Sequence, residues 1–227
     1  MRDRFFYTGM AIAAAVAVFV GFAPTYYLRP YFQATSLAPI LRLHGLVFTA
    51  WILLLLTQTS LVAAHRTDLH RRLGFAGAAL AGLMVVIGLT AAIVSGRRDV
   101  AAGSDEALSF LTTPFADMLV FLLLVAAAIR YRRRAETHKR LMLLATVSIL
   151  DAAVARWPLA IVATSPYAFF VLTDVFIAAG VVYDLASRRR VHPAYTWGGV
   201  LIVASQPLRL VVGQTDTWRA VARMILQ

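Results

Sequence analysis

The sequence contains no cysteine, and Lys139 is the only lysine among 22 basic residues. The missing thiols exclude disulfides, thiolate nucleophiles and thiolate metal ligands, and they leave no redox evidence for the compartment. The missing lysines exclude a retinal protein, which needs a Schiff-base lysine in its last membrane helix. Lys139 lies far from that position, at the start of the third-last apolar stretch of the chain.

Two further patterns are absent. No pair of histidines follows the HxxxH spacing that seven-helix zinc hydrolases typically carry on a late helix. No internal repeat is evident, although many secondary transporters are built from two related halves. These absences make a seven-helix zinc hydrolase and a secondary transporter less favoured. A small substrate pocket between the helices is still compatible with the sequence.

Long apolar stretches dominate what is present. Hydrophobic residues make up 60% of the chain, charged residues make up 15%, and the mean hydropathy is +0.74. A stretch of about 20 apolar residues can cross a bilayer as a helix, the fold in which a segment satisfies its own backbone in lipid. The sequence therefore predicts one all-α domain over residues 1–227, a polytopic transmembrane bundle. Its seven membrane helices are expected at 5–23, 40–63, 72–95, 110–130, 139–157, 166–186 and 194–213.

Basic residues in alternate loops predict the orientation. Fourteen of the 22 Lys and Arg fall at the N-terminus and in the second, fourth and sixth loops. By the positive-inside rule these loops are cytoplasmic, so the N-terminus is expected inside and the C-terminus outside. The net charge of +11 does not indicate a nucleic-acid partner, because the arginine clusters flank membrane helices and lack interleaved aromatic residues. Anionic lipid headgroups at the cytoplasmic rim are the expected partner.

Polar residues on the second predicted helix share one face. His44, Trp51 and Gln58 recur every seven residues, so they line one side of the helix. Polar side chains in a membrane helix generally turn toward the bundle, and an ionisable one there is a functional-site candidate. The alternative is that His44 and Gln58 only make structural hydrogen bonds between helices.

Three aspartates on later predicted helices lie at similar depths. Asp117, Asp151 and Asp174 are expected about 9 to 12 Å below the outer boundary, at 1.5 Å per residue. Together with His44 they could ligate a cation, relay protons or recognise a polar substrate. The alternative is an internal salt-bridge network in which Arg156 pairs with one or two of the carboxylates.

Histidines also gather near the cytoplasmic rim, at positions 65, 70, 138 and 192. Paired histidines on facing helices can hold haem iron, and imidazole suits iron, copper and zinc. His70 and His138 are the first ligands to consider, with His44 as a candidate in the outer half. The alternative is that these histidines cap helices and bind headgroup phosphate beside the arginines.

Five stretches of the chain form recognisable motifs: HGLVFTAWILLLLTQT (44–59), LHRRLG (69–74), ETHKRLMLLAT (136–146), YDLASRRRVHPAYTWGG (183–199) and SQPLRL (205–210). These motifs resemble a family of small bacterial multi-pass membrane proteins, a resemblance that implies no activity. The LHRRLG and HKRLM motifs are also distantly similar to membrane proteins of haem and cytochrome oxidase assembly and to transmembrane b-type cytochromes. The b-type cytochromes place their ligand histidines deeper in the helices. The resemblance implies a location in the bacterial inner membrane.

Three functions remain open at this point. The first is binding of haem b or a transition metal in a redox or cytochrome-assembly role. The second is a metal-dependent membrane hydrolase that uses His44, Asp117, Asp151 and Asp174. The third is a non-catalytic bundle that binds a small molecule or lipid, or has a structural role. A homo-oligomer and a membrane-protein partner are compatible with all three, and the sequence does not decide whether the protein is an enzyme.

Overall fold

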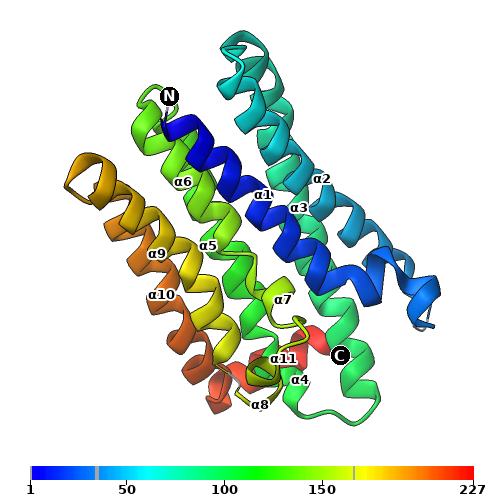
Figure 1. Ribbon diagram of the computed structural model, residues 1–227. Coiled ribbons are helices and arrows are strands. Elements are labelled where there is room, and N and C mark those ends of the chain that lie inside the picture. The colour runs from blue at the N-terminus through cyan, green and yellow to red at the C-terminus, as the bar shows by residue number, and fades with distance from the viewer. Residues whose placement is uncertain (1, 34–35, 166) are drawn as a thin grey trace.

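The chain folds into a bundle of helices that run side by side along one long axis (Figure 1). The structure is a computed structural model and describes residues 2–33, 36–165 and 167–227. Within these ranges 85% of the residues are helical and there are no strands, which confirms the predicted all-α class.

Seven longer helices overlap the seven predicted apolar stretches, and short helices lie between or after them. The long ones are α1 (Arg2–Phe22), α2 (Pro39–Ala63), α3 (Thr67–Ala101), α5 (Thr112–Arg130), α6 (Ala135–Val147), α9 (Ala168–Arg188) and α10 (Pro193–Gly213). The short ones are η1 (Ala23–Tyr27), η2 (Arg29–Phe32), α4 (Glu106–Phe110), α7 (Asp151–Val154), α8 (Ala160–Thr164) and α11 (Asp216–Leu226).

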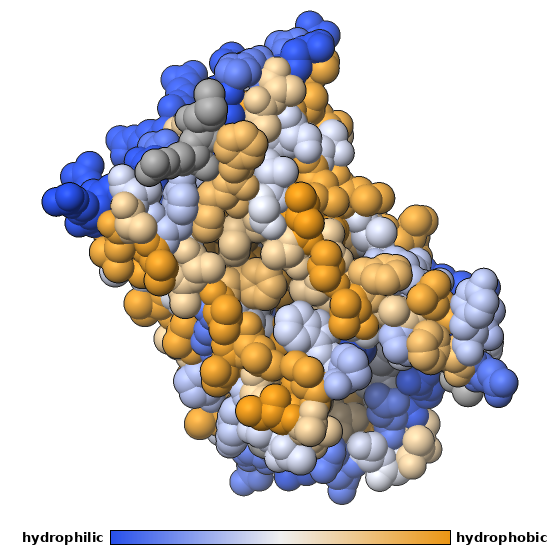
Figure 2. Space-filling model, in the orientation of Figure 1, coloured by the Kyte–Doolittle hydropathy of each residue, from blue (hydrophilic) through white to orange (hydrophobic). Residues whose placement is uncertain are grey.

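Five helical segments of the described chain have the length and apolarity of a membrane span: Asp3–Tyr27, Pro39–Ala63, Thr67–Ala101, Glu106–Arg130 and Ala168–Arg188. Hydrophobic side chains cover much of the middle of the face shown in Figure 2, and hydrophilic ones gather toward its two ends. These features are compatible with a multi-pass membrane protein. The remaining two predicted crossings correspond to α6, which is only 13 residues long, and to α10, which carries Gln206, Pro207 and Arg209.

One end of the bundle collects most of the basic residues, and we call it the basic end. The start of α1 lies there with the α2–α3, α5–α6 and α9–α10 connections, as Figure 1 shows. The opposite end holds α4, α8, α11 and the C-terminus. The alternation of basic loops in the sequence is therefore matched by the arrangement of the helices.

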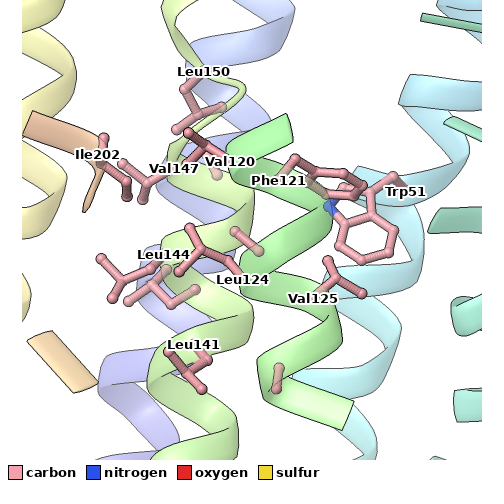
Figure 3. Packing of buried hydrophobic residues seen from close by; sticks show 14 of the residues in the cluster. Trp51, Val120, Phe121, Leu124, Val125, Leu141, Leu144, Val147, Leu150 and Ile202 are labelled. Carbon is pink, nitrogen blue, oxygen red and sulfur yellow. The ribbon is translucent and has the colours of Figure 1, made fainter. Parts of the chain in front are cut away.

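A hydrophobic core takes buried residues from all seven long helices, and one part of it lies where α2 meets α5 and α6. Trp51, Phe121, Leu124 and Leu144 are all buried there (Figure 3). The Trp51 indole packs edge-on against the Phe121 ring, with 5.1 Å between ring centroids. This packing fixes the three helices relative to one another, and so it fixes the polar groups that they carry.

A break interrupts the segment predicted as one helix over 139–157. Helix α6 ends at Val147, and α7 begins only at Asp151. In between, the amide of Leu150 donates to the carbonyl of Val147 at 3.0 Å, a tighter turn than an α-helix makes. Helix α1 packs closely on α7, because a Cβ added to Gly21 would lie 2.1 Å from the carbonyl oxygen of Ala153. The predicted continuous helix is therefore wrong, and the break places Asp151 at the start of a new helix.

Candidate functional site

The structure brings His70 and His138 together at the basic end. His70 lies in the first turn of α3 and His138 in the first turn of α6. Their ring centroids are 6.2 Å apart and the ring planes are nearly perpendicular, at 81°. Histidines that are 68 positions apart in the sequence thus form a pair between two helices.

Each ring of this histidine pair has a polar neighbour on one side. His138 Nδ1 lies 2.9 Å from the carbonyl oxygen of Ala128, a distance at which Nδ1–H donates to that carbonyl. The Gln58 amide nitrogen lies 2.6 Å from His70 Nδ1, in the orientation in which the amide oxygen accepts from the backbone N–H of Gly74 at 3.2 Å. Gln58 therefore faces α3 and contacts one of the candidate ligands.

The other histidines lie elsewhere. His44 stacks on Phe48 with ring centroids 4.0 Å apart, and its buried Nδ1 has no hydrogen-bond partner in the described part of the chain. His65, in a left-handed backbone conformation, contacts the Arg4 guanidinium. His192 caps α10, where its Nδ1 accepts from the amide of Ala194 at 3.1 Å.

Trp51 is buried, with 3% of its surface exposed. Its indole N–H donates to the hydroxyl of Thr146 on α6 at 3.2 Å. His44, Trp51 and Gln58 thus all contact protein groups, but they reach three different neighbourhoods along α2. The face that they share does not build one site.

The basic end also holds a network of ion pairs, which we call the basic-end network. It joins three carboxylates to three cations, and the six residues lie on α1, α6 and α9. The carboxylates are Asp3, Glu136 and Asp184, and the cations are Lys139, Arg140 and Arg188.

Arg140 and Asp184 form the centre of the basic-end network. Both side chains are fully buried, and the Arg140 guanidinium donates to both oxygens of Asp184. Arg140 Nη1 also donates to Glu136 at 2.8 Å, and the backbone N–H of His192 donates to Asp184 at 3.1 Å. Asp3 ties α1 into the network, because Lys139 Nζ and Arg188 Nη2 lie 2.6 and 2.7 Å from its carboxylate.

The pKa values of Glu136 and His192 at this end are displaced. Burial alone would raise the pKa of Glu136, but the hydrogen bonds from Lys139 and Arg140 outweigh it and hold that pKa below its ordinary value. Burial, together with the nearby charge of Arg140, lowers the pKa of His192, so the neutral imidazole that caps α10 is favoured.

The three aspartates predicted at similar depth do approach one another, and we call Asp117, Asp151 and Asp174 the acidic cluster. Arg209 on α10 pairs with Asp117, and its Nη1 lies 3.6 Å from Asp151. Gln206 Nε2, also on α10, donates to Asp174 at 2.9 Å. The salt bridge therefore comes from Arg209, not from Arg156, which lies over the Phe22 ring.

The predicted four-residue metal site is not assembled. Among the residues that the structure describes, no three His, Asp or Glu side chains are grouped to hold a metal ion. His44 instead packs on its own helix neighbour Phe48. The arrangement therefore gives no geometric support to a hydrolase that uses His44 with the three aspartates.

Sequence reasoning missed two parts of these sites. One is Arg209, whose pairing with Asp117 depends on how α5 and α10 pack. The other is Asp3, for which the available signal is its position, because an acidic residue at the start of α1 is suited to the positive helix N-terminus. Comparison of the chain with models of known families, with curated proteins and with solved structures finds no match.

Proposed function

We propose that this chain is an integral protein of the bacterial cytoplasmic membrane that binds haem b, and that His70 and His138 would hold it. The observation that carries the proposal is the pairing of these two imidazoles, 6.2 Å apart on two different helices. The bundle orientation that accompanies it has the basic end in the cytoplasm and the C-terminus outside, as the positive-inside rule requires.

The donor set fits haem better than a bare metal ion. A metal–nitrogen bond of about 2.0–2.1 Å places an imidazole centre roughly 3 Å from the ion, so two centres 6.2 Å apart match two ligands on one metal. Haem iron needs only two protein ligands, whereas a structural zinc site takes four. No third grouped ligand exists among the described residues.

A neighbouring group is suited to orienting His138. Metal-bound histidines commonly donate their second ring N–H to a carbonyl oxygen, as His138 Nδ1 does toward Ala128. At His70 the Gln58 amide nitrogen lies beside Nδ1, so this amide would have to turn over and present its oxygen before Nδ1 could carry the proton and leave Nε2 free to hold the group. When bound, haem iron would supply one-electron chemistry to the membrane.

The test is visible absorption of the purified protein after haem supplementation. The wild type is expected to show a Soret band, and His70→Ala and His138→Ala are each expected to weaken or lose it. His65→Ala is the matched control, because His65 lies at the same end and contacts Arg4 instead. A wild type without haem, or an equal loss in His65→Ala, would overturn the proposal. Metal analysis of the same samples shows whether iron, copper or zinc binds in place of haem.

Exposed arginines at the basic end support a second part of this proposal, contact with anionic headgroups. Arg132, Arg133, Arg189 and Arg190 are exposed on the α5–α6 and α9–α10 connections. Basic residues beside membrane helices attract anionic lipids by about 1 kcal/mol each. Anionic lipid in nanodiscs should raise the melting temperature of the wild type more than that of an Arg132→Gln/Arg133→Gln variant, and an equal rise in both would contradict this contact.

A further inference from the structure

The acidic cluster contains more negative than positive charge. Three carboxylates come from α5, α7 and α9, and the described contacts give them one cation, Arg209. Helix α1 approaches α7 at Gly21, and residues 10–22 of α1 have no titratable side chain. Arg156, which follows α7, lies over the Phe22 ring with 4.9 Å between its guanidinium carbon and the ring centroid.

The hydrogen bonds of Arg209 and Gln206 are already committed. Arg209 donates to Asp117, to the Ser205 hydroxyl at 2.9 Å and to the Ser205 carbonyl at 3.3 Å. Gln206 donates to Asp174. Two of the three carboxylates therefore have a hydrogen-bond donor from α10.

Asp151 is the exception. Only 2% of this residue is exposed, and neither carboxyl oxygen has a hydrogen-bond partner among the described residues. Its nearest cation, Arg209, is 3.6 Å away, and the hydroxyl of Thr173 on α9 donates to the Phe169 carbonyl instead. A buried ionised carboxylate without hydrogen bonds is very costly, whereas a neutral carboxylic acid is far less so.

The helix break accounts for how Asp151 reaches this place. Because α6 ends at Val147 and a tight turn follows, Asp151 begins a new helix that packs against α1 and α9. Interrupted helices in membrane proteins often carry ion-binding groups at the break. The Gly21 contact with Ala153 holds this short helix against α1.

We propose that Asp151 is an intramembrane proton-binding site, which takes up a proton from water as a neutral carboxylic acid and releases it as a carboxylate. Asp117 accepts the hydrogen bond of Arg209, whose Nη1 lies 3.6 Å from Asp151 without donating a hydrogen bond to it. A proton is the fitting occupant because it needs no cavity and no further ligands. A metal cation would need several oxygen ligands, and no such group of acidic residues is present in the described chain.

Infrared difference spectroscopy of the purified full-length protein in nanodiscs tests this site. Wild-type protein at neutral pH is expected to show the C=O stretch of a protonated carboxylic acid, shifted in heavy water, and to lose it when the pH is raised. Asp151→Asn should remove the band. A band that survives in Asp151→Asn, or a wild type without a band at any tested pH, would overturn the proposal.

A second variant keeps the test decisive if Asp151→Asn fails to fold. In Asp117→Asn the Arg209 guanidinium loses its partner and becomes available to Asp151. Asp151 should then be ionised, so the band should disappear although Asp151 is still present. A band unchanged in Asp117→Asn would contradict the assignment to Asp151, and so would a wild-type band abolished by sodium ions at constant pH. Haem content serves as the independent readout, because it should be the same in both variants.

Discussion

The two polar regions of this bundle differ in charge balance. The basic-end network matches three carboxylates with three cations, and each carboxylate has at least two cationic partners: Asp3, Glu136 and Asp184 against Lys139, Arg140 and Arg188. The acidic cluster sets three carboxylates against Arg209, and Asp151 lacks any hydrogen bond among the described residues. Each region has a buried centre, formed by Arg140 and Asp184 in the basic-end network and by Asp117, Asp151 and Arg209 in the acidic cluster, so exposure alone does not explain the difference.

This difference separates a structural role from a functional one. A complete network compensates the cost of burying its charges, and it ties α1, α6 and α9 together. An incomplete one is costly, and ionisable residues kept within a membrane bundle generally mark ion or proton pathways. We therefore expect substitutions in the basic-end network to act on stability and those at Asp151 to act on proton binding.

Replacing Arg140 should have the largest effect. Arg140→Met would leave Asp184 fully buried without its main partner, at a cost of about 3–5 kcal/mol in the free energy of unfolding. Thermal unfolding of the purified protein in detergent measures it. Arg133→Met is the matched control, because Arg133 is exposed at the same end. An equal melting temperature for the two variants would contradict a structural role for the network.

A double substitution sharpens this result. Removing both buried charges in Arg140→Met/Asp184→Leu should recover part of the stability that Arg140→Met loses, because an apolar pair costs less than one unpaired buried charge. A double variant less stable than Arg140→Met would show that Asp184 stabilises the fold through other contacts.

The positions of most helices could be predicted from the sequence, because membrane insertion depends on the length and apolarity of a segment. The predicted stretch 40–63 corresponds to Pro39–Ala63, and 194–213 to Pro193–Gly213. The break after Val147 could not be predicted from the sequence, because Ser148 and Asp151 interrupt an apolar run only weakly. Its geometry depends on the close approach of Gly21 to Ala153, a contact between distant parts of the chain.

The candidate sites were only partly readable. Equal depth correctly placed Asp117 and Asp151 near each other, and both lie beside Arg209. The predicted depth of a residue does not show which arginine faces the aspartates, so Arg156 was expected where Arg209 lies. The spacing of Glu136 with Lys139 and Arg140 could have revealed one part of the basic-end network, since residues three and four apart share a helix face.

The second largest effect is expected at Arg209. Arg209→Met removes the one guanidinium that the described contacts give to the acidic cluster, but Asp117 can respond by taking up a proton. We expect a loss of about 1–3 kcal/mol, the cost of leaving a buried polar group without its partner. Unfolding in detergent compares it with Arg223→Met, an exposed arginine on α11. A loss as large as that of Arg140→Met would mean that the two regions are equally structural.

A smaller, pH-dependent effect is expected at His192. The pKa of His192 is lowered in the folded protein, so its contribution to stability is complete above its unfolded pKa of about 6.5 and is lost as the pH falls through the folded value. Protonation of Nδ1 would remove the cap of α10, at a cost of about 0.5–1 kcal/mol.

His192→Asn provides the comparison, because asparagine caps a helix without titrating in this range. Melting temperatures measured from pH 7.5 to pH 5.5 should fall more steeply for the wild type than for His192→Asn. Parallel curves for the two proteins would show that another group governs this pH range.

The smallest effect on stability is expected at Asp151, where the contrast with the basic end is sharpest. If Asp151 is a neutral acid in the folded protein, Asp151→Asn replaces one uncharged group with another of the same shape. The free energy of unfolding at neutral pH should then change by less than about 0.5 kcal/mol, the range of substitutions that break no network. Asp184→Asn, the same chemical change in the basic-end network, should cost several times more because it removes the negative charge that pairs with Arg140.

Unfolding of both variants in detergent decides between the two states of Asp151. A marked gain in stability for Asp151→Asn would mean that the wild type carries an ionised Asp151 repelled by Asp117, and a marked loss would mean that Asp151 is the working partner of Arg209.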